Sequence, residues 1–226
     1  MNSEPKLSVG VVSADLANFA RDLQLLKEAA TDYLHLDVMD GDFVPMILDA
    51  GLLMKAIKTN SEIAVDVHLM SNRLEQNIAR FAGADMITAH VEASKHLHRV
   101  VQQIKSLDAK VGLALNPGTS LTSLDEVITE LDLVLLLAIN PAFPKQSFIT
   151  ATLDKIKRLR RIRKGRNLDF KIAVDGGVNL DNAKIITAAG ADIIVSGSAI
   201  FKNSEIKNNI NAFRSEFKQG LKEKGV

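Results

Sequence analysis

The sequence predicts a single (β/α)8 barrel domain that takes in all 226 residues. Eight short, apolar, β-rich runs recur along the chain, and segments of helical periodicity separate them. Neighbouring runs begin about 22 to 37 residues apart, which leaves room for one helix and two loops each time. Eight such units are typical of a closed parallel barrel. A doubly wound open sheet is the alternative, but the chain has no Gly-rich nucleotide-binding motif.

The predicted strands span residues 7–12, 33–38, 63–69, 86–91, 110–115, 133–139, 170–175 and 192–197. Residues 16–30 and 206–221 each carry an apolar stripe at helical spacing. Residues 181–190 begin with an Asp suited to an N-cap and end with a Gly suited to close a helix. The tetrapeptide AGAD occurs twice, at Ala82–Asp85 and Ala189–Asp192, so we expect its glycine to end a helix before a strand.

Composition excludes several classes of protein. The chain has no cysteine, so any metal site must use His, Asp or Glu. The formal net charge is +1, which gives no general attraction for nucleic acid or membranes. No apolar run approaches the roughly 20 residues of a membrane span, and the first residues lack a secretion signal. We therefore expect a cytoplasmic protein that binds neither nucleic acid nor a membrane.

The most basic segment, residues 155–166, has eight Lys or Arg among twelve residues. Its apolar residues recur on one stripe, which predicts a helix whose basic side chains form a solvated outer face. The segment has no interleaved aromatic residues, so it is a weak signal for nucleic-acid binding.

Polar residues gather at the carboxyl ends of several predicted strands, where the active sites of barrel enzymes lie. The second strand carries His35 and Asp37, and the third carries Asp66 and His68. Each pair is spaced i, i+2, so both of its members point to the same side of the strand. Asp175 ends the seventh strand. Polar side chains inside a barrel are costly unless they are paired or bound to metal.

Two histidines and two aspartates, at positions 35, 37, 68 and 175, match the ligand preferences of one divalent ion such as Zn, Mn, Fe or Co. A hydrogen-bonded polar layer without a metal is the alternative. We expect Asp66 to orient a neighbour, and His90 and Glu92 to support the site or to form polar core.

The seventh and eighth strands end in glycine-bearing loops, at Gly176–Gly177 and at Gly197–Ser198. Backbone N–H groups exposed there form an anion site in many barrels, so these loops predict a phosphate site. Two ordinary tight turns are the alternative.

These motifs, in order and over nearly the whole chain, resemble ribulose-phosphate 3-epimerase. The resemblance rests on LHLDVMDGDFVP, DVHLM, HVEA, VGLALNPGTS, VDGGV and VSGSAIF. It implies epimerisation at C3 of a 2-ketose phosphate, interconverting D-ribulose 5-phosphate and D-xylulose 5-phosphate through a metal-stabilised enediolate. It also implies a small phosphorylated ketose as partner and an assembly of identical chains, a homo-oligomer.

The resemblance assigns a role to each matching residue. It implies that the metal ligands are His35, Asp37, His68 and Asp175, and that the two aspartates are the acid and the base. The substrate-binding residues that it implies are Met39, His68, Met70, Gly176, Gly177, Gly197 and Ser198.

The sequence departs from the family pattern at several positions. Gly10 replaces a serine that touches substrate, Met46 replaces an asparagine, and Leu137 replaces an active-site methionine. In the loop after the sixth strand, Ala142, Pro144 and Lys145 replace three lid glycines around Phe143. A lid without these glycines has fewer conformations open to it. The substrate therefore stays open between a pentulose phosphate and a hexulose phosphate such as allulose 6-phosphate.

Two further alternatives remain. One is a non-catalytic protein that senses sugar phosphates, although the intact set of four ligands disfavours it. Orotidine-phosphate decarboxylase and hexulose-phosphate synthase also use a phosphate-binding barrel, and they share an Asp-x-Lys-x-x-Asp motif on the third strand. Here His68 stands in place of that lysine and the second aspartate is missing, which disfavours both.

Overall fold

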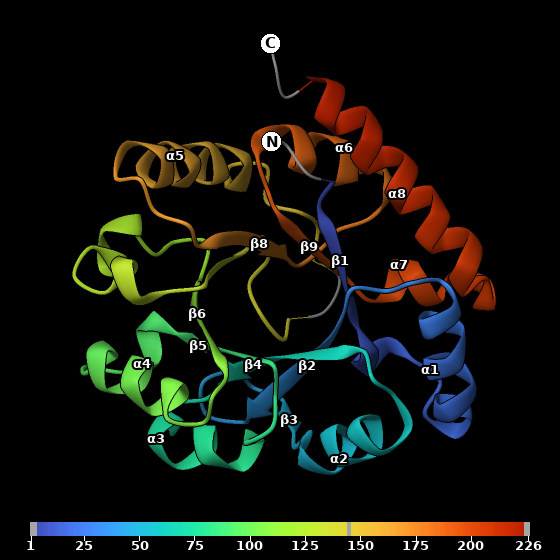
Figure 1. Ribbon diagram of the computed structural model, residues 1–226, viewed down its shortest axis with the longest axis horizontal. Helices are drawn as coiled ribbons and strands as arrows, with labels where there is room; N and C mark the ends of the chain where they lie inside the picture. Colours follow the sequence, from blue (N-terminus) through green and yellow to red (C-terminus); the bar gives the residue numbers. More distant parts are fainter. Residues whose placement is uncertain (1–3, 144–145, 224–226) are drawn as a thin grey trace.

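The eight predicted strands form a closed parallel barrel (Figure 1). The computed structural model describes residues 4–143 and 146–223. The barrel strands are β1 (Lys6–Gly10), β2 (Tyr33–Asp40), β4 (Ala64–Met70), β5 (Met86–His90), β6 (Lys110–Leu115), β7 (Leu133–Leu137), β8 (Lys171–Asp175) and β9 (Ile193–Ser196). They pair in chain order, and β1 closes the ring by pairing with both β2 and β9. The predicted single-domain (β/α)8 barrel is thus confirmed, and its limits at residues 1 and 226 stay a prediction.

Helices surround the barrel (Figure 1). They are α1 (Phe19–Glu28), α2 (Gly51–Asn60), α3 (Leu74–Asn77), α4 (Leu97–Lys105), α5 (Thr152–Gly165), α6 (Leu180–Ala189), α7 (Ser198–Phe201) and α8 (Ile206–Glu223). The predicted apolar stripe of α8 is buried at Ile206, Ile210, Phe213 and Phe217. No described helix is both long and apolar enough to cross a membrane.

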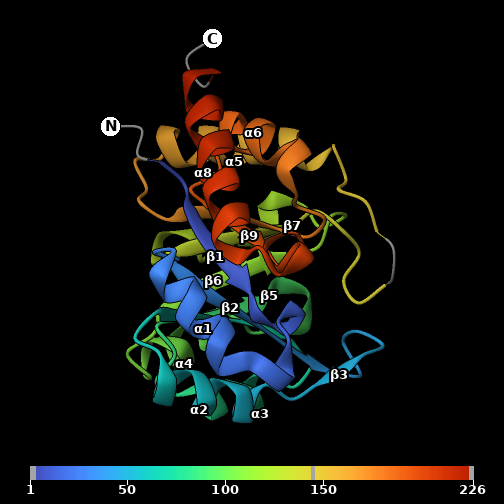
Figure 2. The same cartoon turned by 90° about the vertical axis from the view of Figure 1, so that its right-hand side faces the viewer.

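A short strand that the sequence did not predict, β3 (Ile47–Leu48), turns back antiparallel against the end of β2. The turn is formed by the last residue of β2 and the residues that follow it. Asp40 Oδ1 accepts the backbone N–H groups of Asp42 and Phe43 at 2.9 and 2.8 Å, and Gly41 has a φ of 77°. The Asp40 carboxylate therefore builds a turn at the barrel mouth, where β3 and the described residues of the loop before α5 project from the same end (Figure 2).

The start of α6 corrects the predicted cap. Asn179, and not Asp181, is the N-cap: its side chain accepts the N–H of Asp181, and the Asn182 side chain reaches back to the backbone of Asn179. The predicted helix end is confirmed, because Gly190 has the left-handed φ of 117°.

The solvated basic face predicted for residues 155–166 is wrong at Lys155. Its side chain is buried, and Nζ donates to the carbonyl oxygen of Asn116 at 2.8 Å. Arg163 also turns inward, where it donates to the carbonyl oxygen of Phe170 and pairs with Asp192. The cause is the position of α5, whose first turns lie over the loop after β6.

Residues alternate along each strand between an outer layer that packs on the helices and a barrel interior. The interior is apolar on the side of β6 to β9, with Ala114, Leu135, Leu137, Ala173 and Ile193. It is polar on the side of β1, β2, β4 and β5, with buried Ser8, His35, Asp66, His68, Thr88 and His90. The barrel thus concentrates its polar side chains on one half of its wall.

Four aspartates fasten the other end of the barrel, and we call them the aspartate clips. Each precedes a strand, and its carboxylate accepts a backbone N–H from the neighbouring strand. Asp32 accepts from Leu7 at 2.9 Å, Asp85 from Val65 at 2.7 Å, Asp132 from Val111 at 2.8 Å and Asp192 from Ile172 at 2.9 Å. The clips join β1 to β2, β4 to β5, β6 to β7 and β8 to β9. Two of them are the final residues of the AGAD repeats, whose aspartate the sequence left without a role.

Candidate active site

The register between β2 and β4 places the side chains of the predicted site in three facing pairs. His35 lies opposite Asp66, Asp37 opposite His68, and Met39 opposite Met70. Because these positions alternate by two, all six side chains face the barrel interior. The strands therefore bring a polar pair, a second polar pair and a methionine pair to successive depths below the mouth.

Asp175 reaches the same place from β8, so the four predicted metal-ligating residues lie together. One ligand atom from each of them lies within 4.8 Å of all the others. Asp37 Oδ1 is 3.3 Å from His35 Nε2 and 3.0 Å from His68 Nδ1. Asp175 Oδ2 is 3.9 Å from each of the same two nitrogens. The histidine side chains are fully buried, whereas the carboxylates keep 17% and 20% exposure toward the mouth.

His35 is held by a carboxylate on its far side, as the sequence predicted for Asp66. Its Nδ1 lies 2.8 Å from Asp66 Oδ2, and the hydroxyl of Ser8 reaches the same oxygen at 3.4 Å. A carboxylate oxygen accepts in this contact, so Nδ1 carries the proton. His35 Nε2 is buried and has no hydrogen-bond partner among the described residues. It faces the space between Asp37 and Asp175.

His68 begins a chain of buried hydrogen bonds that leads away from the site. Its Nε2 lies 2.9 Å from Nε2 of His90, and Nδ1 of His90 lies 2.9 Å from Oε2 of Glu92. Burial lowers the pKa of His90 to about 4, so its ring is neutral at pH 7. His90 and Glu92 are therefore joined to the site through His68.

The two carboxylates of the cluster differ in their tendency to ionise. Burial opposes the charge on Asp37, but the neighbouring His35 and His68 hold its pKa well below the ordinary value. Burial raises the pKa of Asp175, and the negative charge of Asp37 acts in the same direction. Carboxylates whose environments push their pKa values apart are typical of an acid and a base that work together.

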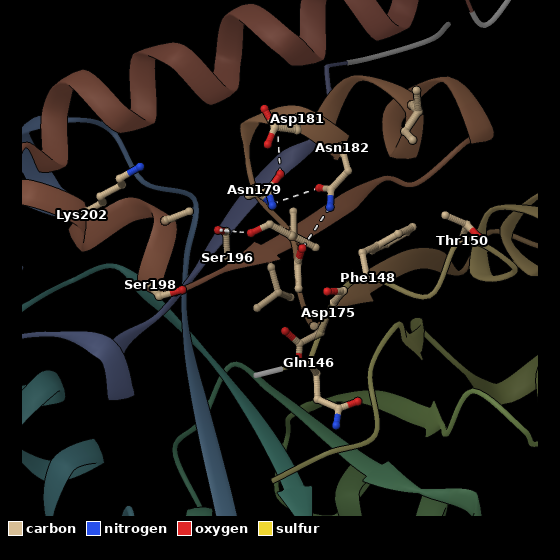
Figure 3. Close-up of a pocket in the computed structure, with 18 residues that line it drawn as sticks. Gln146, Phe148, Thr150, Asp175, Asn179, Asp181, Asn182, Ser196, Ser198 and Lys202 are labelled. Atoms are coloured by element: carbon tan, nitrogen blue, oxygen red, sulfur yellow. Dashed lines mark hydrogen bonds between the residues drawn. The ribbon is translucent and has the colours of Figure 1, made fainter. Parts of the chain in front are cut away.

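A cavity of about 720 Å³ opens beside Asp175 (Figure 3). It is lined by all four residues of the predicted phosphate loops, Gly176, Gly177, Gly197 and Ser198, and by Phe148 and Lys202. A Cβ on Gly177 would lie 2.8 Å from the backbone nitrogen of Phe148, and its φ is 66°. A Cβ on Gly197 would lie 2.8 Å from Ser13 Oγ. Gly177 therefore needs glycine, whereas a side chain at position 197 would require Ser13 to move; both glycines leave the backbone open to the cavity.

The departures from the family pattern lie around this site. Gly10 ends β1 next to His35, and a Cβ there would lie 3.3 Å from Cα of Gly197. Ala142 has a left-handed φ of 60° and packs on Met39, Met70 and Val44. Leu137 is buried in the apolar half of the barrel, whereas Met46 is exposed at the rim. Pro144 and Lys145 lie outside the described residues.

Three further residues support the site without a signal in the sequence. Ser8 reaches Asp66, Thr119 donates to Glu92, and Lys155 holds the loop that contains Asn116. All three depend on contacts between segments far apart in the sequence, and no spacing along the chain gives those contacts.

Comparison with known proteins agrees with these motifs. The sequence model described as the Ribulose-phosphate 3 epimerase family matches residues 6–201. A ribulose-phosphate 3-epimerase of Bacillus subtilis is 40% identical over 213 residues, covering 92% of this chain and 98% of the relative. One of Synechocystis is 42% identical over 205 residues and covers 89% of each chain. The chloroplastic ribulose-5-phosphate-3-epimerase of Arabidopsis thaliana is 39% identical, covering 92% of this chain and 76% of the relative.

Solved structures of lower identity share the barrel. Orotidine 5'-monophosphate decarboxylase from Sulfolobus solfataricus superposes with a TM-score of 0.67 at 12% identity, covering 97% of this chain and 99% of the other. A 3-hexulose-6-phosphate synthase gives 0.63 at 18% identity, covering 95% and 99%. At these identities the likeness shows the fold alone.

Proposed function

This chain belongs to the ribulose-phosphate 3-epimerase family and is an epimerase of a carbohydrate phosphate, and on that premise we propose its mechanism. Asp37 and Asp175 act as the acid and base that invert C3 of a 2-ketose phosphate, D-ribulose 5-phosphate in one direction and D-xylulose 5-phosphate in the other. One observation carries the proposal: two carboxylates from separate strands, β2 and β8, meet at two buried imidazoles, with one ligand atom of each within 4.8 Å of the rest.

The four side chains fit a divalent ion of the Zn, Mn, Fe or Co type. Two atoms that each bind one such ion at about 2.0–2.2 Å can lie no more than about 4.4 Å apart. The distances between the nitrogens and the carboxylate oxygens here run from 3.0 to 3.9 Å. The buried Nε2 of His35, which has no hydrogen-bond partner among the described residues, would also be satisfied by such an ion. When bound, the ion supplies a Lewis acid that stabilises the negative charge left when the C3 proton departs.

The two aspartates carry the proton transfers in the proposal. Asp37, whose pKa is held low, accepts the C3 proton, and Asp175, whose pKa is raised, donates a proton to the opposite face. The roles exchange in the reverse direction. The methionine pair above them, Met39 and Met70, bounds the reacting carbons with polarisable, non-nucleophilic sulfur. His68 would hold the ion and also contact the substrate.

The phosphate of the substrate occupies the cavity beside Asp175 in this proposal. The backbone of Gly176, Gly177, Gly197 and Ser198 lines it, and Lys202 adds a positive charge at its wall. This places the phosphate next to one of the two acid–base residues, so that the chain of the sugar extends toward Asp37.

Replacing one aspartate tests the acid–base assignment. We expect Asp175→Asn to remove epimerase activity, because an amide neither accepts nor donates the C3 proton, while the circular dichroism spectrum stays that of the wild type. Asp154→Asn is the matched control, because Asp154 is an exposed residue of α5. Normal turnover by Asp175→Asn would rule out the two-carboxylate mechanism.

The sugar is identified by a panel of pentulose and hexulose phosphates, assayed with Zn, Mn, Fe and Co in turn. We expect the highest kcat/KM with D-ribulose 5-phosphate. A preference for allulose 6-phosphate would correct the substrate and keep the mechanism. Binding without turnover of any ketose phosphate would instead identify a sensor.

A further inference from the structure

We propose that His90 and Glu92 are positioning residues that fix the tautomer of His68, so that its Nδ1 presents a lone pair to the metal. The inference rests on the proposed function, because it deepens the account of the metal site. Among the described residues, the hydrogen bonds of His90 and Glu92 reach the four-residue cluster through His68. Both act on the ion through the ring that they orient.

The two site histidines need opposite tautomers. His35 faces Asp37 and Asp175 with Nε2, so its proton must sit on Nδ1, and Asp66 accepts it at 2.8 Å. His68 faces the same carboxylates with Nδ1, so its proton must sit on Nε2. A neutral histidine offers only one lone pair, and the second nitrogen's hydrogen bond decides which one it is. Each ring therefore needs its own acceptor.

The acceptor for His68 is another imidazole, whose own tautomer must be set in turn. Glu92 Oε2 lies 2.9 Å from Nδ1 of His90, and a carboxylate only accepts, so Nδ1 of His90 carries the proton. The neutral ring then has its lone pair on Nε2, which lies 2.9 Å from Nε2 of His68. His68 must donate there, and its Nδ1 is left free for the ion. The charge of Glu92 thus sets the tautomers of both the His90 and the His68 rings.

Contacts with neighbouring residues hold this series of hydrogen bonds in place. Glu92 Oε1 accepts the backbone N–H of Asn116 at 2.8 Å and the hydroxyl of Thr119. Lys155 fixes the same loop through the carbonyl oxygen of Asn116 at 2.8 Å. The ring of Phe43 packs on His90, with centroids 4.6 Å apart. The orientation of His68 is therefore determined by contacts outside the ligand set.

The variant Glu92→Gln should reverse the donor and acceptor roles in the series of hydrogen bonds that runs from residue 92 through His90 to His68. The backbone N–H of Asn116 is a fixed donor, so the carbonyl oxygen of the new amide faces it and the amide NH2 faces His90. Nδ1 of His90 then accepts, its Nε2 donates to His68, and Nδ1 of His68 carries a proton in place of a free lone pair. We expect the variant to bind Zn about 10- to 100-fold more weakly than the wild type, measured by competition with a chelator.

The matched control is Thr119→Val, which removes the other side-chain hydrogen bond to Glu92 and leaves the carboxylate facing His90. We expect its Zn affinity to stay within about twofold of the wild type. A folded Glu92→Gln protein that loses less than about tenfold in Zn affinity overturns the inference. An equal loss in both variants also overturns it, because a general loosening of the loop then explains the effect.

Nitrogen-15 NMR of histidine-labelled wild-type protein tests the same point without a variant, and it decides the case if Glu92→Gln does not fold. We expect Nε2 of His68 and Nδ1 of His90 to be protonated and Nε2 of His90 to be unprotonated, with or without Zn. An unprotonated Nε2 on His68 overturns the inference. A wild type that shows these tautomers but binds no divalent ion contradicts the proposed metal site instead, so the two failures are distinguishable.

Discussion

Three hydrogen bonds that support the site converge on Glu92, from His90, Asn116 and Thr119. Burial alone would raise the pKa of its carboxyl group, but hydrogen bonds from His90, Thr119 and Asn116 lower it to about 2. The ordinary value is 4.5. A carboxyl group whose pKa is depressed on folding stabilises the native state above its unfolded pKa, and that contribution disappears as the pH falls toward the folded pKa.

The contribution of Glu92 to stability therefore depends on pH in a known direction. We expect the wild type to exceed Glu92→Gln in free energy of unfolding at pH 6, and the gap to shrink as the pH falls from 4.5 toward about 2. Urea unfolding of both proteins over this range measures the gap, and subtracting one from the other cancels the remaining carboxyl groups. A gap that stays constant between these pH values would contradict the assigned hydrogen bonds.

For individual residues, the sequence predicted which positions form the site but not which of their side chains contact one another. Spacing of i, i+2 on predicted strands placed His35 with Asp37 and Asp66 with His68, because alternation is a local property of a strand. Which aspartate contacts which histidine depends on the register between β2 and β4, where His35 lies opposite Asp66. Register is set by the whole barrel, so the partners had to come from the structure.

Among the elements, the aspartate clips are the feature whose loss is easiest to measure. Asp192 accepts the N–H of Ile172 at 2.9 Å and pairs with Arg163, and its side chain is 24% exposed. We expect Asp192→Ala to lower the free energy of unfolding by about 1–3 kcal/mol, because it leaves a partly buried donor without an acceptor. Chemical denaturation of the variant and the wild type gives this difference.

Two control variants separate the hydrogen bond from charge. Asp192→Asn keeps an oxygen for Ile172 and should lose less stability than Asp192→Ala. Asp154→Ala removes an exposed i, i+4 pair with Arg158 and should change stability by less than about 0.5 kcal/mol. If the three variants are equally stable, the clips do not fasten the strands.

The helices and strands also show which features a local sequence pattern predicts and which it does not. All eight strands were predictable, since each is a buried apolar run bounded by polar residues or glycine. Strand β3 was not, because two residues carry no periodicity and its pairing comes from the turn that Asp40 builds. Lys155 was placed on the wrong face because the loop that receives its ammonium group lies 39 residues away in the sequence.

In the molecule as a whole, the barrel divides into an apolar half-wall and a polar half-wall, and the cluster of four lies within the polar one and at β8. Solved barrels of 12–18% identity share the architecture. The chemistry is therefore set by which side chains face inward and not by the barrel itself. The expected homo-oligomer stays a prediction.

An ion that binds four residues from β2, β4 and β8 should stabilise the entire barrel. At a free concentration of 100 times its dissociation constant, we expect the ion to add about 2.7 kcal/mol to the free energy of unfolding. Thermal unfolding with a chelator and then with Zn measures the effect as a rise in Tm. The variant Asp37→Asn should lose most of the rise. An equal rise in that variant would place the ion elsewhere.

The most direct test of the central claim, that two opposed carboxylates exchange protons at C3, is epimerisation in heavy water. Wild-type protein loaded with metal converts D-ribulose 5-phosphate, and mass spectrometry reads the C3 hydrogen of substrate and product early in the reaction. We expect the product to carry one deuterium at C3, supplied by the second aspartate after exchange with solvent, while the remaining substrate keeps protium. Product that retains its original C3 hydrogen, or a complete absence of C3 exchange, would contradict the account.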